Sequence, residues 1–286
     1  MAADGFSLAL GVTRVLRSTV ATALVALAVV ASACGSKDGV PTVGAGDPDK
    51  ILYERGAETL NNRKWFTARE YFKQIVDGYP QSVYRADAKL GLADTYLGEN
   101  SPQAIVLALN EYREFLSFYP THPRADYAQY KLAMCHYTQM AKPERDQSET
   151  KEALTEFAAF FERFPNSPLA AEAKTRQREA RDRLSESEYR VGLFYYRSKW
   201  YPGAIDRLQS VLKQDPEFTG RDAVYFYLAD SLTKVTRAAE AAPYFQRILD
   251  EFVQSDFLEP ARRRLEELKT PAAPRAPESQ VPREVS

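Results

Sequence analysis

The residues that could carry out chemistry are few in this chain, and they are not grouped. Two cysteines and two histidines occur among 286 residues, and the only neighbouring pair is Cys135-His136. Adjacent residues of a helix point about 100° apart, so this pair cannot act as nucleophile and base. Cys135 follows Leu132, Ala133 and Met134, a setting that predicts a buried small hydrophobic side chain rather than a reactive thiol.

Familiar catalytic and metal-binding motifs are also missing from the sequence. It contains no Gly-rich phosphate loop and no H-E-x-x-H, G-x-S-x-G or C-x-x-C pattern. Carboxylates such as Asp87, Asp94 and Glu99 are scattered, and each is expected to be solvated on its helix. His122 is flanked by prolines, which predicts a loop. We therefore predict a protein that is not an enzyme, with no catalytic residue, no metal and no cofactor.

The other cysteine, Cys34, follows an export signal. Arg14 and Arg17 precede Val20–Ala33, an uncharged stretch of 14 residues, whereas a membrane-spanning helix needs about 20. A basic flank, a short apolar core and a small-residue end are typical of a secretory signal peptide. We predict that residues 1–33 are this signal and are removed.

The run Ala31-Ser32-Ala33-Cys34-Gly35 resembles the lipobox of bacterial lipoproteins. The resemblance implies that the Cys34 thiol receives a diacylglycerol and becomes the mature N-terminus, so Cys34 is the lipid-attachment residue and palmitate would label it. Gly35, rather than Asp, implies sorting to the outer membrane. Residues 34–47, rich in Gly, Ser and Asp, are expected to form a flexible tether. The alternative is a plain signal peptide cut after Ala33, with Cys34 incidental.

The composition favours packed helices and excludes several classes of protein. Hydrophobic residues make up 44% and charged residues 27% of the chain, as in ordinary soluble proteins. The formal net charge of -1 offers no basic field, which argues against nucleic acid as a partner. The chain holds 17 Tyr and 15 Phe but only 13 Gly, a balance that suits packed helices better than a barrel of tight turns.

A repeated pattern supplies the elements of the fold. A small residue is followed by Ala, then by an aromatic residue or Leu four positions later, and usually by Pro. This is the signature of the tetratricopeptide (TPR) repeat, a pair of antiparallel helices. Its five copies are Gly56…Ala68-x3-Phe72…Pro80, Ala93…Ala108-x3-Tyr112…Pro120, Ala133…Ala153-x3-Phe157…Pro165, Gly192…Ala204-x3-Leu208…Pro216 and Ala229…Ala241-x3-Phe245.

The fold class that we predict is an all-α solenoid of five TPR helix pairs over residues 48–268. The spacing from the small residue to Ala is 12 residues in three copies, 15 in the second and 20 in the third. We therefore expect longer helix–helix turns at Gly98–Ser101 and Ala141–Ser148. One long helix, or two nearly continuous ones, is expected around Glu172–Arg197. The repeats are predicted to cover about 48–82, 83–122, 123–167, 168–218 and 219–260.

Helix starts and the C-terminal part of the chain are indicated as well. Ser101-Pro102 and Ser167-Pro168 each place a capping side chain before Pro at the first helical position. Residues 269–286 contain four prolines and show no apolar periodicity. We predict that they form a disordered tail.

Tyrosines gather on the expected first helices of the repeats, the helices that line the inner surface of a TPR solenoid. Their rings offer a large contact area, and their hydroxyls can bond to a peptide backbone. We predict a peptide-binding groove there, with Tyr53, Tyr127, Tyr130 and Tyr137 as its contacts. The alternative is that these rings only pack between neighbouring helices.

Two stretches of the chain carry a closer resemblance. One contains Tyr53-x2-Gly56-Ala57 and Phe66-x-Ala68-x3-Phe72, and the other runs from Arg181-Asp182-Arg183-Leu184 to Tyr195-Tyr196. Together with the lipobox, they are similar to the BamD-like (ComL-like) outer-membrane assembly lipoproteins over about Asp49 to Leu268.

That family resemblance implies a lipid-anchored accessory of the β-barrel assembly (Bam) complex at the periplasmic face of the outer membrane. The C-terminal repeats of such proteins bind the POTRA domains of the barrel subunit BamA. Their N-terminal repeats receive the C-terminal targeting segments of unfolded barrel clients, which here would enter the tyrosine groove. By position, the resemblance implies Arg207 as a partner-binding residue, and we group Tyr189 and Tyr196 with it.

Two other functions fit the same sequence less well. A different periplasmic TPR lipoprotein, such as a secretin pilotin or a cell-division coordinator, would share the repeats, although a coordinator would usually carry an N-terminal coiled coil. A cell-wall hydrolase would need a cluster of catalytic residues, and none can be assembled from this sequence.

Overall fold

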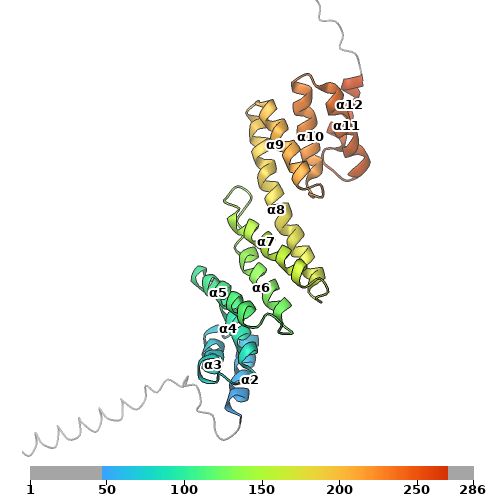
Figure 1. Ribbon diagram of the computed structural model, residues 1–286. Coiled ribbons are helices and arrows are strands. Elements are labelled where there is room, and N and C mark those ends of the chain that lie inside the picture. Colours follow the sequence, from blue (N-terminus) through green and yellow to red (C-terminus); the bar gives the residue numbers. More distant parts are fainter. Residues whose placement is uncertain (1–46, 270–286) are drawn as a thin grey trace, which may run out of the picture. The chain divides into compact units, whose positions relative to one another are not determined.

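The computed structural model describes residues 47–269, and every regular element in this range is an α-helix (Figure 1). Of the described residues, Leu52 to Lys269 belong to one compact unit, and the first turn of α2 comes before it in the sequence. The helices are α2 (Pro48–Asn61), α3 (Trp65–Gly78), α4 (Arg85–Glu99), α5 (Pro102–Phe118), α6 (Ala125–Thr138), α7 (Ser148–Arg163), α8 (Ala170–Arg197), α9 (Tyr201–Gln214), α10 (Arg221–Lys234), α11 (Ala238–Glu251) and α12 (Leu258–Lys269).

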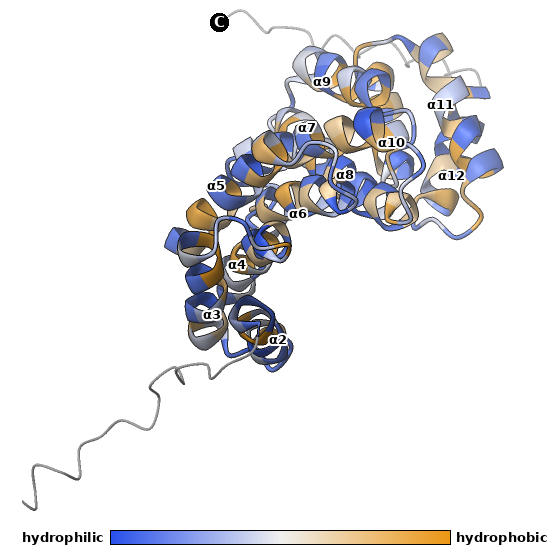
Figure 2. Cartoon of the chain, turned by 60° about the horizontal axis from the view of Figure 1, so that its bottom comes forward, coloured by the Kyte–Doolittle hydropathy of each residue, from blue (hydrophilic) through white to orange (hydrophobic). Residues whose placement is uncertain are grey.

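The predicted all-α solenoid of TPR helix pairs is confirmed. From α3 to α12, each helix packs against the next one along the chain. Figure 2 shows that each helix carries both hydrophobic and hydrophilic residues, as expected for helices that bury one face. The Ala-x3-aromatic/Leu positions of all five pairs are buried, with at most 1% of each side chain exposed: Ala68 and Phe72, Ala108 and Tyr112, Ala153 and Phe157, Ala204 and Leu208, and Ala241 and Phe245.

The small residues of the pattern leave room for the large residue of the partner helix. A Cβ atom added to Gly56 of α2 would come within 2.6 Å of the Phe72 ring, and one added to Gly192 of α8 would come within 2.8 Å of Leu208. Neither contact is possible without moving a buried side chain. Glycine is therefore required by the packing within the first and the fourth helix pairs.

The three extra residues of the second pair do not lengthen a turn, so that prediction is wrong. They extend α5, which begins at Pro102, six residues before Ala108, whereas α3 begins at Trp65, three residues before Ala68. The Ser101 side chain accepts a hydrogen bond from the Ala104 backbone N–H (3.2 Å). This N-cap, with Pro at the next position, starts the helix early.

In the third pair, the longer turn is present, as residues 139–147 between α6 and α7. Gln147 organises this loop from within. Its side-chain amide donates to the carbonyl oxygens of Lys142 (2.8 Å) and Arg145 (2.9 Å), and its side-chain oxygen accepts from Thr150 (2.9 Å). The loop also contacts the middle of α8, because Arg183 donates to the carbonyl of Ala141 (3.2 Å).

The long helix predicted around Glu172–Arg197 is confirmed as α8, with 28 residues. The predicted Ser167 cap is wrong, because α8 begins only at Ala170. The Ser167 hydroxyl instead donates to Asp126 of α6 (2.6 Å) and accepts from the backbone N–H of Leu169 (3.1 Å). A further helix that the repeat pattern did not indicate, α12, packs on α11 and buries Ala261 and Leu265.

Several predictions fall outside the described residues: the signal peptide 1–33, the lipid site Cys34, all of the tether 34–47 except its last residue, and the tail from residue 270. Lys269, predicted to begin the tail, is the last residue of α12. Among the helices of residues 47–269, none has the length and apolar character needed to cross a membrane. In the same range, no group of three or more His, Cys, Asp and Glu side chains is placed to hold a metal ion.

Candidate binding surfaces on the first helices

The predicted tyrosines of α6 and α8 join neighbouring first helices by hydrogen bonds to carboxylates. The four bonds run from Tyr127 to Asp94 of α4 (3.0 Å), from Tyr130 to Glu172 of α8 (2.8 Å), from Tyr137 to Glu179 of α8, and from Tyr196 to Asp230 of α10 (2.7 Å). We call these the tyrosine–carboxylate contacts. They connect α4, α6, α8 and α10 in a row, so the structure does bring the predicted tyrosines onto one series of helices.

Tyr130 lies deeper than a groove residue would. Only 4% of it is exposed, and its ring packs near Phe157 and Phe160 of α7, at centroid distances of 6.4 and 6.3 Å. The expectation that Tyr130 contacts a peptide is thus not supported by its position, because α7 covers the ring. For this residue, the alternative of packing between helices describes the structure better.

Tyr53, Tyr127 and Tyr137 keep part of their rings at the surface. Tyr53 stands apart from the row of contacts and stacks on Tyr84, with ring centroids 5.2 Å apart. Cations accompany the other two rings: the Arg124 guanidinium lies 4.7 Å from the centre of the Tyr127 ring, and that of Arg176 lies 5.6 Å from the Tyr137 ring. Such an arrangement can bind aromatic side chains and a carboxylate of an extended peptide.

Asp94 is the carboxylate whose role the sequence analysis missed. It accepts hydrogen bonds from Tyr112 of α5 (2.5 Å) and from Tyr127 of α6 (3.0 Å). Burial raises the pKa of the Asp94 carboxyl above its usual range, although these hydrogen bonds oppose the shift. Asp87 and Glu99 are also paired, with Arg124 (3.0 Å) and Arg69 respectively. The expectation of a solvated carboxylate is therefore wrong for Asp94, whereas Glu99 is exposed and Asp87 is partly exposed.

A signal for two of the missed partners was present in the sequence. Tyr130 and Tyr137 are seven residues apart, and their acceptors Glu172 and Glu179 are also seven residues apart. Both pairs are separated by 42 residues. Two residues two helical turns apart on α6 thus bond to two residues two turns apart on α8. The constant separation of 42 residues is the signal from which these partners could have been predicted.

Tyr189 and Tyr196 of α8 face the C-terminal helices. The Tyr196 ring packs 4.9 Å from that of Tyr227, and the Tyr189 ring lies 6.3 Å from the same residue. Asp230, which accepts the Tyr196 hydroxyl, is 1% exposed and also lies 2.7 Å from the Arg264 guanidinium of α12. Tyr196 therefore takes part in a buried polar network that links α8, α10 and α12. The rings of Tyr189 and Tyr196 are both partly buried, so only part of each could contact a partner.

Arg207 lies on α9, and about half of its side chain (52%) is exposed. Its guanidinium is 3.8 Å from the Glu188 carboxylate of α8, which is a loose ion pair. The Arg207 side chain can therefore leave Glu188 for another carboxylate at little cost.

A hollow that sequence reasoning did not predict lies between α3, α4 and α5, with a volume of about 660 Å³. Lys89 of α4 lies at this hollow, and its ammonium group contacts Glu111 (2.7 Å) and Glu114 (2.8 Å) of α5. The basic side chains that line the hollow, Lys73, Arg85 and Lys89, are matched by three acidic ones, Asp77, Glu111 and Glu114. This hollow has no net preference for an anion or a cation.

The chain is similar in sequence to one protein family and to several named proteins. A family model, YfiO, described as an outer membrane lipoprotein, matches residues 46–232. The chain is 29% identical to the outer membrane protein assembly factor BamD of Caulobacter vibrioides, over 78% of this chain and 72% of the relative. Proteins of the same name from Vibrio cholerae (29% identical, 68% and 82% covered) and Neisseria meningitidis serogroup B (25% identical, 82% and 91% covered) are similar to it as well.

Proposed function

The chain belongs to the YfiO family of outer membrane lipoproteins, and from that premise we propose that it is a non-enzymatic scaffold of the β-barrel assembly machinery. The observation that carries the proposal is the match to relatives named outer membrane protein assembly factor BamD over most of the chain. The row of first helices adds a surface suited to peptides. In this role the chain would hold a BamA-like barrel subunit by its POTRA domains and receive unfolded barrel clients.

The membrane attachment is part of the same proposal. The mature chain would begin at Cys34, carry acyl chains there and stay at the periplasmic face of the outer membrane. Residues 34–47 would then connect the anchor to α2, after removal of the signal peptide 1–33. Residues 270–286 would follow the helices as a disordered, proline-rich tail.

For the client, we place the binding surface on the N-terminal first helices, around Tyr53, Tyr127 and Tyr137. The half-buried rings of Tyr127 and Tyr137, each with a cation beside it, suit a segment that ends in an aromatic residue and a carboxylate. Arg124 and Arg176 would be the nearest cations for that carboxylate. Tyr130 is not included as a direct contact, because its ring is covered.

Removing two of these rings should weaken client binding. We expect the double variant Tyr127→Ala, Tyr137→Ala to bind a client C-terminal peptide at least tenfold more weakly, because interface rings contribute about 1–2 kcal/mol or more each. Fluorescence anisotropy with a labelled peptide measures this. The matched control is Tyr127→Phe with Tyr137→Phe, which keeps both rings and removes only the hydroxyls that bond to Asp94 and Glu179. Equal affinity of the Ala and Phe variants would place the client site elsewhere.

For the barrel subunit, we propose contacts through the C-terminal repeats with Arg207 as one of them. A rim ion pair is worth roughly 0–1 kcal/mol, whereas removal of one member of a desolvated pair costs about 2–5 kcal/mol. Charge reversal adds repulsion to the lost contact, so it discriminates better than truncation.

Arg207→Glu is expected to reduce recovery of the BamA-like subunit sharply when the protein is purified from solubilised membranes. The helical circular dichroism spectrum should stay unchanged, because Arg207 is half exposed. Arg247→Glu on α11 is the matched control, since that arginine is also about half exposed (50%) and pairs with Glu251. Full recovery with Arg207→Glu would remove this residue from the interface, and recovery of no such subunit with the wild type would favour another periplasmic role.

A further inference from the structure

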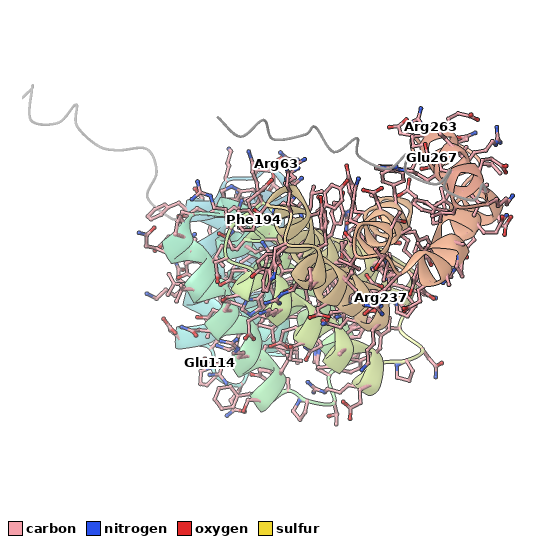
Figure 3. The ribbon with its side chains drawn as sticks, turned by 90° about the horizontal axis from the view of Figure 1, so that it is seen from above. Arg63, Glu114, Phe194, Arg237, Arg263 and Glu267 are labelled. Atoms are coloured by element: carbon pink, nitrogen blue, oxygen red, sulfur yellow. The ribbon has the colours of Figure 1, made fainter. Side chains whose placement is uncertain are left out.

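The C-terminal end of α8 and the turn after it expose an unusual amount of apolar surface. Val191, Phe194 and Trp200 are 37%, 64% and 55% exposed, respectively, and Phe194 is labelled in Figure 3. We call these three residues the aromatic strip. Single exposed apolar residues are common on proteins, but a contiguous group is typical of an interaction site.

Two members of the strip, Val191 and Phe194, lie outside the faces of α8 that pack within the helix pair. The face of α8 that contacts α9 carries Gly192, which meets Leu208 and the Cβ of Arg207. The face toward α10 carries Tyr196, which bonds to Asp230. Val191 and Phe194 are three residues apart and therefore share a different face of the helix. The fold leaves this face without a partner among the described residues.

The rings of the strip are held in fixed positions. Tyr195 connects them, because its ring lies 5.7 Å from that of Phe194 and 4.8 Å from that of Trp200, both edge to face. The backbone N–H of Trp200 donates to the Tyr195 carbonyl (3.0 Å) across a turn in which Lys199 is left-handed (φ 61°). Trp200 also lies over Gly203, where a Cβ atom would come within 2.5 Å of the ring. Rings fixed before binding lose little entropy on binding.

Positive charges border the strip. Arg197 and Lys199 are exposed, and neither forms an ion pair with any side chain of residues 47–269. Arg207 approaches from α9, and its loose partner Glu188 precedes Val191 by three residues on α8. The aromatic strip is thus continuous with the surface that the proposed function gives to Arg207. Exposed apolar residues with Arg197, Lys199 and Arg207 nearby fit an apolar surface that carries carboxylates at its edge.

We propose that the aromatic strip is the apolar centre of the partner interface, and that its occupant is a folded domain that presents an apolar patch bordered by carboxylates. The inference rests on the proposed function, because it deepens the site of Arg207. Phe194 and Trp200 would supply most of the binding free energy. Arg197, Lys199 and Arg207 would orient the bound domain. Buried rings surrounded by a polar rim are the usual anchors of protein interfaces.

The chain has two tryptophans, so a Trp65→Phe background makes Trp200 the only one and its fluorescence a direct reporter. Adding the purified POTRA domains of the barrel subunit should shift the Trp200 emission to shorter wavelength. In the same titration, Phe194→Ser should raise the Kd about tenfold or more. Phe66→Ser is the matched control, because Phe66 is 71% exposed and lies on α3; it should leave the Kd unchanged. Circular dichroism should show the same helix content in every variant.

The outcomes distinguish a failure of the aromatic strip from a failure of the proposed function. Binding by wild type with an unchanged Kd for Phe194→Ser, or without a shift of Trp200 emission, overturns the strip and leaves the proposed function standing. No binding by wild type removes both. Deletion of residues 270–286 tests the tail as an occupant: a shift of Trp200 emission to longer wavelength without any partner would show that the tail covers the strip, which contradicts the proposal.

Discussion

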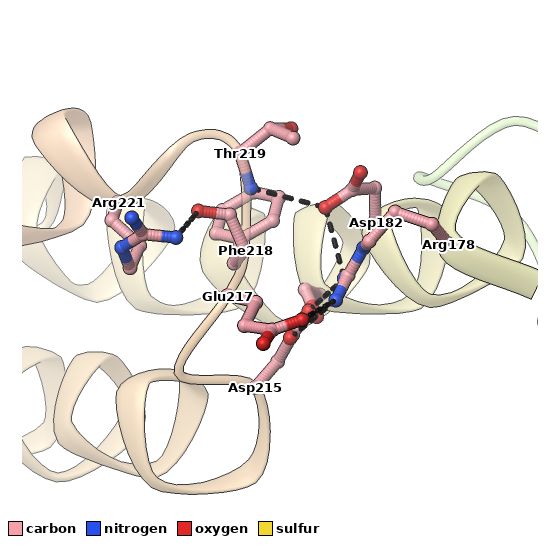
Figure 4. A network of polar contacts seen from close by, with 8 residues as sticks. Arg178, Asp182, Asp215, Glu217, Phe218, Thr219 and Arg221 are labelled. Atoms are coloured by element: carbon pink, nitrogen blue, oxygen red, sulfur yellow. Dashed lines mark hydrogen bonds and ion pairs between the residues drawn. The ribbon is translucent and has the colours of Figure 1, made fainter. Parts of the chain in front are cut away.

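Replacement of Arg178 by alanine is expected to lower the free energy of unfolding by about 2–4 kcal/mol, because it leaves a buried carboxylate without its cation. That carboxylate belongs to Asp215, which is 4% exposed at the end of α9. The Arg178 guanidinium donates to Asp215 (2.9 Å) and to Asp182 (3.0 Å), as Figure 4 shows. The expected loss is below that of a fully buried pair because 30% of the Arg178 side chain is exposed.

The same network joins the long helix to the C-terminal pairs. Ser185 of α8 donates to the Asp215 carboxylate (2.6 Å), and the backbone N–H of Thr219, in the turn before α10, donates to Asp182 (3.0 Å). Three residues of α8, namely Arg178, Asp182 and Ser185, thus hold the end of α9 and the following turn, and Figure 4 labels the first two. Loss of Arg178 should therefore loosen the attachment of α9 and α10 to α8.

The effect of Arg178→Ala should depend on pH in a defined direction. Burial raises the pKa of Asp215, but the hydrogen bonds from Arg178 and Ser185 outweigh it and hold that pKa below its usual range. A group with a depressed pKa stabilises the fold above its unfolded value, about 4, and this contribution is lost as the pH falls through the folded-state pKa. The difference between wild type and variant should therefore be full at pH 7 and shrink at about pH 3.

Urea denaturation followed by circular dichroism at the two pH values measures this prediction. Arg262→Ala is the control, because Arg262 is 60% exposed and pairs with Glu259, three residues away on α12; it should cost about 0.5 kcal/mol or less. Equal costs for the two variants at pH 7 would show that Asp215 is not stabilised by Arg178.

The sequence predicted the helix pairs because local residue pattern and packing agree in this fold. Ala204 and Leu208 are spaced for one helical face, and both are fully buried. The extra helical turn of α5 was not predicted, because spacing between motif residues cannot tell a longer turn from a longer helix. The Ser101 cap decided that question, and its signal was present in the sequence.

The binding surfaces were predicted less completely, because burial of a ring depends on helices far along the chain. Tyr130 and Tyr137 are the same residue type on the same helix, and both rings lie 6.4 Å from that of Phe157 on α7, yet only Tyr130 is buried. Phe194 lies within the second stretch that resembles the family but was not among the residues that carried the resemblance. Its exposure follows from the way α8 packs on α9 and α10. Side-chain partners such as Asp94 and Asp230 are fixed by this packing, not by their local sequence.

Substitution of Cys34 by serine is expected to move the protein from the membrane fraction to the soluble fraction almost completely. The prediction follows from Ala31-Ser32-Ala33-Cys34-Gly35, since only a thiol at this position can receive the diacylglycerol. Each buried CH₂ of an acyl chain contributes about 0.8 kcal/mol, and a single chain anchors only marginally. Several chains on one residue would therefore account for nearly all of the membrane affinity, and their loss should be close to all-or-none.

Fractionation of cells and labelling with palmitate test this together. The wild type should carry the label and sediment with the outer membrane, whereas Cys34→Ser should carry none and stay soluble in the periplasm. Cys135→Ser is the matched control, because Cys135 is the other of the two cysteines and its side chain is buried in α6; it should keep both label and location. A plain signal peptide cut after Ala33 predicts the opposite pattern, an unlabelled wild type whose location does not change when Cys34 is replaced. The two cysteines thus separate the lipid anchor from every other cause of membrane association, because only one of them can carry the acyl chains.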